Sequence, residues 1–234
     1  MISDRELMRF HVEAEFSHDA EAQLVRVNEP NGTGAAAPRF FLGKTLDGVV
    51  VRFRHDVGND VRRELKPAVA HDVQPESALD RPSDPAPYQA ILSRVAPVER
   101  TWTGPAFFFP RELPMSDGTT IITDANADIL RPHLEAWIPD VPLSQPMIAL
   151  TVDGHAASLC ASVRLTADAH EAGVDTAPPF RGRGYAAQVV VAWAREVRDL
   201  GRIPLYSTSW GNDASRAVAR KIGLIQFGND LHVT

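Results

Sequence analysis

The chain has 234 residues, of which 44% are hydrophobic and 23% charged, and its formal net charge is −6. This composition is ordinary for a globular protein with one or two cores, and the negative balance argues against general binding to nucleic acid or anionic membranes. A single cysteine, Cys160, excludes an internal disulfide and suits a reducing compartment. The first residues lack an apolar signal core and no apolar run reaches membrane-spanning length, so we expect a cytoplasmic protein.

The first half of the chain gives weak signals. Residues 2–16 have the apolar spacing of a short amphipathic helix, and residues 39–44 and 49–53 resemble two strands joined by a turn. Five prolines between positions 67 and 87 predict an extended linker or surface loop, because proline interrupts helices and central strands. The aromatic block at 102–110 predicts a buried strand or the seam between two halves of the protein.

The pattern is sharper from residue 118 onward. In chain order we expect a strand at 119–123, a helix at 127–137, a hairpin at 147–165, a strand at 169–176, a helix at 184–200, a strand at 204–210, a helix at 212–222 and a last strand from residue 224. This alternation indicates a mixed α/β sheet with parallel crossovers. We therefore predict an ancillary α+β domain at 1–117 and an α/β domain at 118–234.

A basic, glycine-rich loop joins the predicted strand at 169–176 to the helix after it. Its sequence is Phe180-Arg181-Gly182-Arg183-Gly184-Tyr185-Ala186. Glycines let backbone amides converge on an anion, the start of a helix adds free donors, and arginines suit phosphate oxygens. The loop therefore indicates a site for a phosphorylated ligand, best a pyrophosphate, although glycines at such a turn also occur for packing alone.

Two other phosphate-binding patterns fit the loop poorly. A dinucleotide-binding sheet would need more chain after residue 184 than remains. The phosphate loop of nucleotide hydrolases needs a lysine and a hydroxyl residue after its last glycine, where Tyr185 and Ala186 stand.

Residues 118–234 resemble the GCN5-related N-acetyltransferase (GNAT) superfamily. The loop matches the first signature of that superfamily at Arg181, Gly184 and Ala186. The helix at 212–222 matches a second signature at Asn212, Ser215, Lys221, Gly223 and Leu224. The resemblance implies a GNAT-type mixed central sheet flanked by helices and acetyl-CoA as co-substrate. Glu171, Asp175-Thr176 and Trp210-x-Asn212 look closest to the zwittermicin-resistance type of this superfamily.

The resemblance also assigns cofactor contacts. The backbone of Val174, Asp175 and Thr176 would pair with the pantetheine amides, and a free strand edge suits a diamide arm. The loop would hold the pyrophosphate with Arg181, Gly182, Arg183, Gly184, Tyr185 and Ala186. Asn212 and Ser215 would face the pantetheine arm, although Asn212 equally fits a simple helix cap and Ser215 a first-turn hydroxyl with no ligand.

Glu171 is the candidate base. Acetyl transfer to an amine needs a group that takes the ammonium proton, and the resemblance places a glutamate at this position of the strand. Burial beside Ala172 and Val174 would raise the pKa of this carboxyl toward neutrality. A surface carboxylate that only holds substrate is the alternative, and Asp175 is a weaker candidate for the base.

The usual acid of the superfamily is missing. Its tyrosine would fall at Ala219, which leaves protonation of the thiolate to Ser215, Tyr206 or water. His155 and His170 have no partners at metal-ligand spacing, so we expect no metal.

The resemblance implies direct transfer of an acetyl group to the amine of an unidentified small molecule in a ternary complex. The N-terminal half would wall the acceptor pocket, and its aromatic block (Trp102 and Phe107 to Phe109) is the hydrophobic candidate for the seam. We expect no nucleic-acid or membrane partner, and exposed late strands are compatible with a homodimer. A non-catalytic CoA-binding regulatory module and an acyltransferase that uses a longer acyl-CoA stay open as alternatives.

Overall fold

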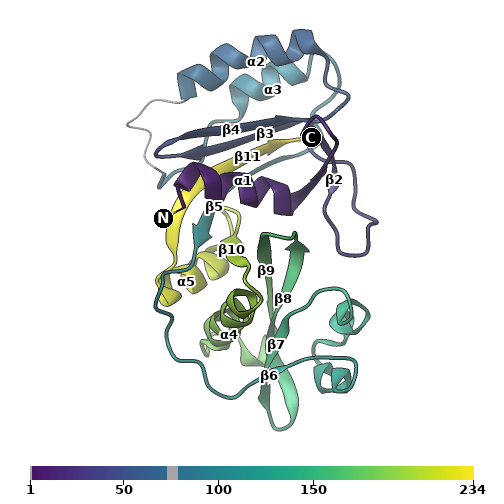
Figure 1. The fold of residues 1–234 in the computed structure, drawn as a ribbon, viewed down its shortest axis with the longest axis vertical. Coiled ribbons are helices and arrows are strands. Elements are labelled where there is room, and N and C mark those ends of the chain that lie inside the picture. Colours follow the sequence, from purple (N-terminus) through teal and green to yellow (C-terminus); the bar gives the residue numbers. More distant parts are fainter. Residues whose placement is uncertain (1, 73–78) are drawn as a thin grey trace.

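The computed structural model describes residues 2–72 and 79–234, which build one nine-stranded mixed sheet with helices on both faces (Figure 1). In spatial order its strands are β4 (Gly48–Phe53), β3 (Phe40–Thr45), β11 (Ile225–Val233), β5 (Thr101–Phe108), β10 (Ile203–Ser207), β9 (Ala169–Thr176), β8 (His155–Leu165), β7 (Met147–Val152) and β6 (Thr119–Ile121). A small antiparallel pair, β1 (Phe16–His18) with β2 (Leu24–Val27), lies beside it. The predicted fold class, a mixed sheet flanked by helices, is confirmed.

Strands from the two halves of the chain alternate within the sheet. β5 lies between β10 and β11 and is antiparallel to both, while β3 pairs with the other edge of β11. The aromatic block predicted at 102–110 is therefore a central strand. The division into domains at 1–117 and 118–234 stays a prediction. In the sheet, β5 of the first range lies between β10 and β11 of the second range.

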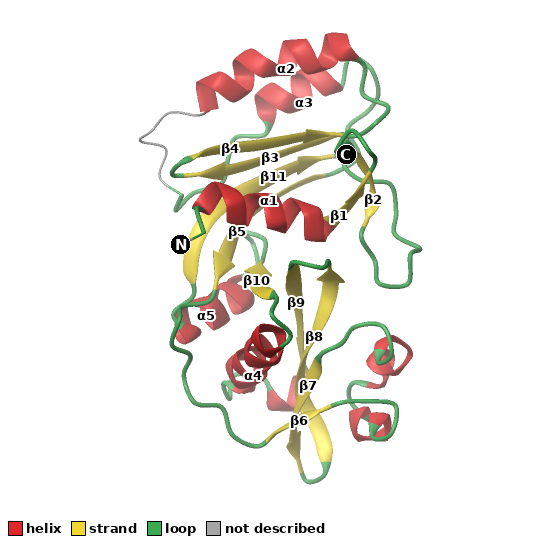
Figure 2. Cartoon of the chain, viewed as in Figure 1, coloured by secondary structure: helices red, strands yellow, loops and turns green. Residues whose placement is uncertain are grey.

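The helices cover opposite faces of the sheet (Figure 2). α1 (Asp4–Glu15) packs its apolar side on one face, against Phe41, Ala106 and Leu205. On the other face, α2 (Asn59–Asp72) and α3 (Ala86–Leu92) cover β3 and β11. α4 (Tyr185–Asp199) lies farther along that second face, against β7 to β10, and α5 (Asp213–Ile222) packs beside α4. No helix in the described ranges is both long and apolar enough to cross a membrane.

Two predictions for the regions between strands need correction. The proline-rich segment at 67–87 is predicted to be an extended linker or surface loop, and residues 79–85 do lie outside helices and strands. Pro67, however, lies inside α2, whose Leu65 and Val69 are buried in the cluster that faces β3 and β11. Of the predicted loop, residues 73–78 lie outside the described residues. The helix expected at 127–137 is instead two short 3₁₀ helices, η1 (Ala127–Leu130) and η2 (Glu135–Asp140), because Pro132 has no amide hydrogen to continue the first.

Elements around the glycine-rich loop follow the sequence closely. Asp153 and Gly154 take positive φ values of 51° and 82° in the turn between β7 and β8. β9 occupies 169–176 as predicted, and α4 and α5 end before Gly201 and Gly223, which take the positive φ of helix-terminating glycines. A helix or strand whose ends carry such local signals can be placed from sequence alone.

Candidate active site

The parallel strands β9 and β10 separate in the middle of the sheet. They pair from Ala169 opposite Ile203 to Glu171 opposite Leu205, and no farther. Beyond that point β8 stays with β9 up to Thr176, and β5 stays with β10 up to Ser207. The facing edge of β9 after Glu171 therefore has backbone groups that no strand in the described ranges pairs with.

A cavity of about 780 Å³ fills this split and extends to the start of α4. Residues of β9 and β10 at the split form the floor of the cavity. The glycine-rich loop forms its far end, and α5 forms one side. Trp102 of β5 is the contribution of the N-terminal half. The predicted site residues that line it are Val174, Asp175, Thr176, Arg181, Gly182, Gly184, Tyr185, Ala186, Asn212 and Ser215.

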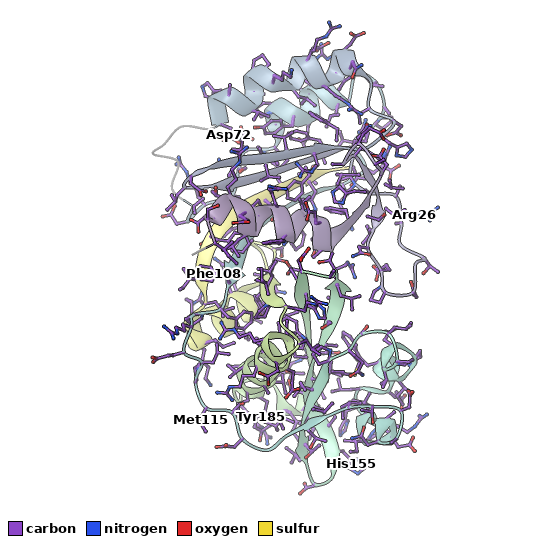
Figure 3. All side chains as sticks on the ribbon, in the orientation of Figure 1. Arg26, Asp72, Phe108, Met115, His155 and Tyr185 are labelled. Carbon is purple, nitrogen blue, oxygen red and sulfur yellow. The ribbon has the colours of Figure 1, made fainter. Side chains whose placement is uncertain are left out.

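The loop end of the cavity has the form of an anion site. Gly182 and Gly184 have φ values of +77° and +82°, which side chains disfavour. Gly184 is the N-cap of α4 and has no side chain to accept from the first amides of the helix. A Cβ at Gly184 would overlap Nζ of Lys221, so this ammonium lies directly over the loop. Free amides, a helix terminus and a cation thus converge at one place (Figure 3 labels Tyr185 at the start of α4).

Two loop arginines have different surroundings. Nε of Arg181 donates to the carbonyl of Thr176 at 3.0 Å, which ties the loop to the end of β9. Arg183 is not among the cavity-lining residues, and its guanidinium lies over the ring of Phe180, 5.5 Å from the centroid. The contact of Arg183 with a phosphate stays a prediction. It would require this exposed side chain to move toward the cavity.

Asn212 and Ser215 combine the two roles that the sequence left open. The Asn212 side chain accepts from the amide of Ser215 at 3.0 Å, so Asn212 is a helix cap. Both residues also line the cavity. The Ser215 hydroxyl lies 2.7 Å from that of Tyr206, another lining residue. Burial raises the pKa of Tyr206 to about 12, so its hydroxyl is protonated at neutral pH.

Glu171 is buried behind the cavity wall, on the face covered by α1. Only 2% of it is exposed, and its Oε2 accepts a hydrogen bond at 3.3 Å from Ser207 Oγ, whose residue lines the cavity. Its Oε1 lies 2.6 Å from Nδ1 of His11. Burial raises the pKa of Glu171 above its ordinary value, and the charge and hydrogen bond of His11 act in the opposite direction.

The contact with His11 belongs to a longer chain of polar groups. Nε2 of His11 lies 3.1 Å from Oδ2 of Asp230, and the same oxygen lies 2.7 Å from Nε2 of His232. Sequence reasoning missed these three residues, as it missed Ser207. One signal was available for His11, which shares a helix face with Leu7, Met8 and Val12, where a histidine needs a polar partner.

Potential metal ligands also meet at this point. His11, Glu15 and Glu171 offer ligand atoms that all lie within 4.8 Å of one another, although no spacing in the sequence indicated it. In the structure, however, Nδ1 of His11 and Oε1 of Glu171 are at hydrogen-bonding distance. These two groups are therefore bonded to each other rather than open to a metal ion.

Asp175 faces the same side of the sheet as Glu171 but contacts a different element. Nε1 of Trp137, in η2, donates to Oδ2 of Asp175 at 3.3 Å. Trp102 also faces this side, with its ring centroid 6.1 Å from that of His232. The cavity is therefore open to both faces of the split sheet, with an aromatic wall on the α1 face.

A comparison with protein families matches the part of the chain that contains most of the cavity-lining residues. Residues 152–233 match the family model described as FR47-like protein. No curated protein matches the chain. The matched residues include β9, the glycine-rich loop, α4, β10 and α5, which supply most of the cavity lining, and the zwittermicin-resistance type stays a prediction.

Several solved structures are similar to the chain at low identity. A GNAT-family protein from Novosphingobium aromaticivorans is 18% identical with a TM-score of 0.48, over 58% of this chain and 65% of that one. A GCN5-related N-acetyltransferase-like protein from Streptococcus suis is 17% identical with a TM-score of 0.45, over 58% and 62%. A GNAT-family acetyltransferase from Colwellia psychrerythraea is 14% identical with a TM-score of 0.48, over 79% and 75%. The chain thus spans less than two thirds of the first two.

Proposed function

We propose, with the FR47-like match of residues 152–233 as the premise, that this chain is an N-acetyltransferase that moves the acetyl group of acetyl-CoA to the amine of a small molecule. The observation that carries the proposal is one cavity that joins an anion-binding loop to a split between parallel strands, with a buried carboxylate behind the split.

The cavity offers complementary groups along an extended, phosphorylated ligand. The amides of Gly182 to Ala186 and the ammonium of Lys221 suit the pyrophosphate of CoA. The unpaired edge of β9 at 172–176 suits the two amides of the pantetheine arm, in the manner of an added strand. A thioester at the end of that arm would then lie in the split, near Ser207 and Tyr206.

The acceptor amine would approach from the α1 face. Trp102 and Asp175 line the cavity on that side, and an aromatic ring with a carboxylate suits a cationic amine. Glu171 would take the first proton of the ammonium, either through the Ser207 hydroxyl that donates to it or through water. A base whose pKa is raised by burial, yet held ionised by a neighbouring cation, suits this step.

The reaction balances with these groups. The freed amine nitrogen attacks the thioester carbonyl carbon, the C–S bond breaks and an amide forms. The nitrogen loses two protons in all, the departing thiolate takes up one, and one is released to solvent. The protonated Tyr206 hydroxyl, paired with Ser215, is the group we assign to protonation of the thiolate. Holding both reactants in the split supplies much of the rate enhancement.

The experiment that tests this function starts with binding. Titration calorimetry of acetyl-CoA and CoA should give saturable binding to the native protein and none to Gly184→Trp, whose side chain would meet Lys221 and fill the loop end of the cavity. Gly201→Trp is the matched control, because Gly201 has a similar positive φ, +72°, but open space around it at the other end of α4. Absence of binding by the native protein would refute the proposal.

Acyl transfer is then measured against a panel of small-molecule amines and a panel of acyl-CoA chain lengths. Glu171→Gln should keep CoA binding and lose roughly 100-fold or more in kcat/KM, the usual contribution of a general base. If Glu171→Gln changes neither binding nor any measured property, the CoA-binding regulatory module is the better description.

A further inference from the structure

We propose that His11 is a positioning residue, which stands as an imidazolium between Glu171 and Asp230 and keeps Glu171 ionised as the base. This inference rests on the proposed function for the role of Glu171, and on the geometry of four buried or half-buried side chains for the charge of His11. It assigns a part of the active site to the first helix of the chain.

Both ring nitrogens of His11 face carboxyl groups. Each of its ring nitrogens faces a carboxylate oxygen, Oε1 of Glu171 at 2.6 Å and Oδ2 of Asp230 at 3.1 Å. A neutral imidazole has one N–H and one bare nitrogen, so the carboxyl that faces the bare nitrogen would have to carry the proton itself. The doubly protonated ring donates to both.

The surroundings favour the same charge state. His11, Glu171 and Asp230 are 1%, 2% and 1% exposed, so a carboxylate here without a cation would be strongly destabilised. Oδ1 of Asp230 is buried without a hydrogen-bond partner in the described structure. The negative charge of Asp230 is therefore compensated through Oδ2, which His11 and His232 share.

The other titratable group at the site adds negative charge. Glu15, one turn after His11 on α1, faces the same point, and its carboxylate raises the pKa of Glu171 further. β10 contributes only the hydroxyl of Ser207, and β11 contributes Asp230 and His232. Burial opposes the charge on His11, but the two carboxylates raise the pKa of His11 well above its ordinary value.

The functional consequence concerns the pH at which Glu171 is a base. In a dry site crowded with carboxylates, Glu171 alone would hold a proton at neutral pH and could not accept one from an amine. The imidazolium of His11 offsets this, and Asp230 holds the imidazolium in place. Removing His11 should shift the ionisation of Glu171 to higher pH rather than merely lower the rate. Removing Asp230 has two opposed effects, because the charge of Asp230 itself raises the pKa of Glu171.

Nuclear magnetic resonance of protein labelled with ¹⁵N-histidine tests the charge directly and needs no acceptor. The signal lost in His11→Gln identifies His11 among the eight histidines. We expect both of its nitrogens to be protonated at pH 8 in the native protein, and one to lose its proton in Asp230→Asn. His133→Gln, which removes an exposed histidine, is the control and should leave the His11 signal unchanged. A native spectrum with one bare His11 nitrogen at pH 7 would overturn the inference.

The pH dependence of kcat/KM tests the consequence once an acceptor is known. In His11→Gln the acidic limb should move up by roughly one pH unit or more, with activity recovering at high pH. An equal loss at every pH would mean a structural role only. Should His11→Gln not fold, the nitrogen spectrum of Asp230→Asn still decides the matter. If His11 is an imidazolium but the protein does not bind CoA, only the proposed function is refuted. If the protein transfers acyl groups with a neutral His11, only this inference is refuted.

Discussion

Lys221, in the last turn of α5, lies directly over Gly184, the residue at which α4 begins. The two belong to different helices that meet at the loop end of the cavity. Gly184 has no side chain, and the Lys221 ammonium has no hydrogen bond or salt bridge to the residues that the structure describes. An anion placed on the loop would lie against both.

Lys221→Met should therefore weaken binding of CoA by about fivefold, a modest effect because the ammonium is exposed to solvent. The loss should shrink at 0.5 M salt, where exposed charges are screened. Calorimetric titration with CoA measures it. Arg220→Met removes a neighbouring cation from the same helix turn without touching the cavity and should change little. Equal effects of the two variants would contradict a local contact with the phosphates.

Tyr206→Phe removes the hydroxyl that pairs with Ser215 at the cavity wall. If this hydroxyl protonates the leaving thiolate, kcat should fall about 10- to 100-fold while the Kd for acetyl-CoA stays within twofold. Stopped-flow measurement of thiol release follows the step. Ser215→Ala leaves the phenol in place and should cost less. Native turnover in Tyr206→Phe would assign the proton to water instead.

Gly104→Ala tests a close approach between β5 and the end of β10. A Cβ at Gly104 would overlap the backbone carbonyl of Thr208, a cavity-lining residue, and a backbone atom yields less readily than a side chain. We expect a loss of about 1–3 kcal/mol in the free energy of unfolding and weaker CoA binding. Gly58→Ala, where the added Cβ meets nothing within 4 Å, is the control in the same urea titrations. An unchanged unfolding midpoint in Gly104→Ala would show that the two segments move apart easily.

Stability should decline as the pH rises above neutrality. The two carboxylates raise the pKa of His11 above about 6.5 in the folded state, so the folded protein binds more protons than the unfolded one above that pH. The free energy of unfolding then falls by up to about 1.4 kcal/mol per pH unit until His11 loses its proton. The raised pKa of Glu171 has an effect of the same sign at lower pH, from its ordinary value of 4.5 up to its raised value.

Asp230 has the opposite effect on the free energy of unfolding at acidic pH. His232 and His11 hold the pKa of Asp230 below its ordinary value against the effect of burial, so the stability that its ionised form contributes is lost as the pH falls below about 4. Urea denaturation between pH 3 and pH 9 measures both slopes. His11→Gln should flatten the alkaline slope, and a slope unchanged in this variant would argue against the charge assigned to His11.

The parts of the site that sequence revealed are those with local causes. The turn glycines at 182 and 184, the cap at Asn212 and the helix-terminating Gly223 each act within a few residues, so their spacing alone indicates the loop and the two helices. The 3₁₀ helices around Pro132 show the limit of this approach, because apolar spacing favoured a continuous helix that one missing amide hydrogen interrupts.

The rest of the site depends on pairing across the sheet. His11 and Glu171 are 160 residues apart, and Asp230 lies near the other end of the chain. No local pattern states that α1 covers β9 or that β5 enters between β10 and β11. Pro105 in the interior of β5 even argues against a central strand, yet the chain after β10 bonds to its carbonyl through the amide of Thr208. Such contacts follow from the topology of the whole sheet.

The place of β5 also governs how the protein is made. While it is being synthesised, β5 emerges well before β10 and β11, the strands that pair with its two edges. Until residues 203–233 leave the ribosome, the apolar ribbon that includes Phe107 and Phe108 has open hydrogen-bonding edges, which are prone to join other chains. Nascent chains stalled before α5 should therefore need chaperones more than the finished protein does, since β11, the last strand of the sheet to be made, pairs with the second edge of β5.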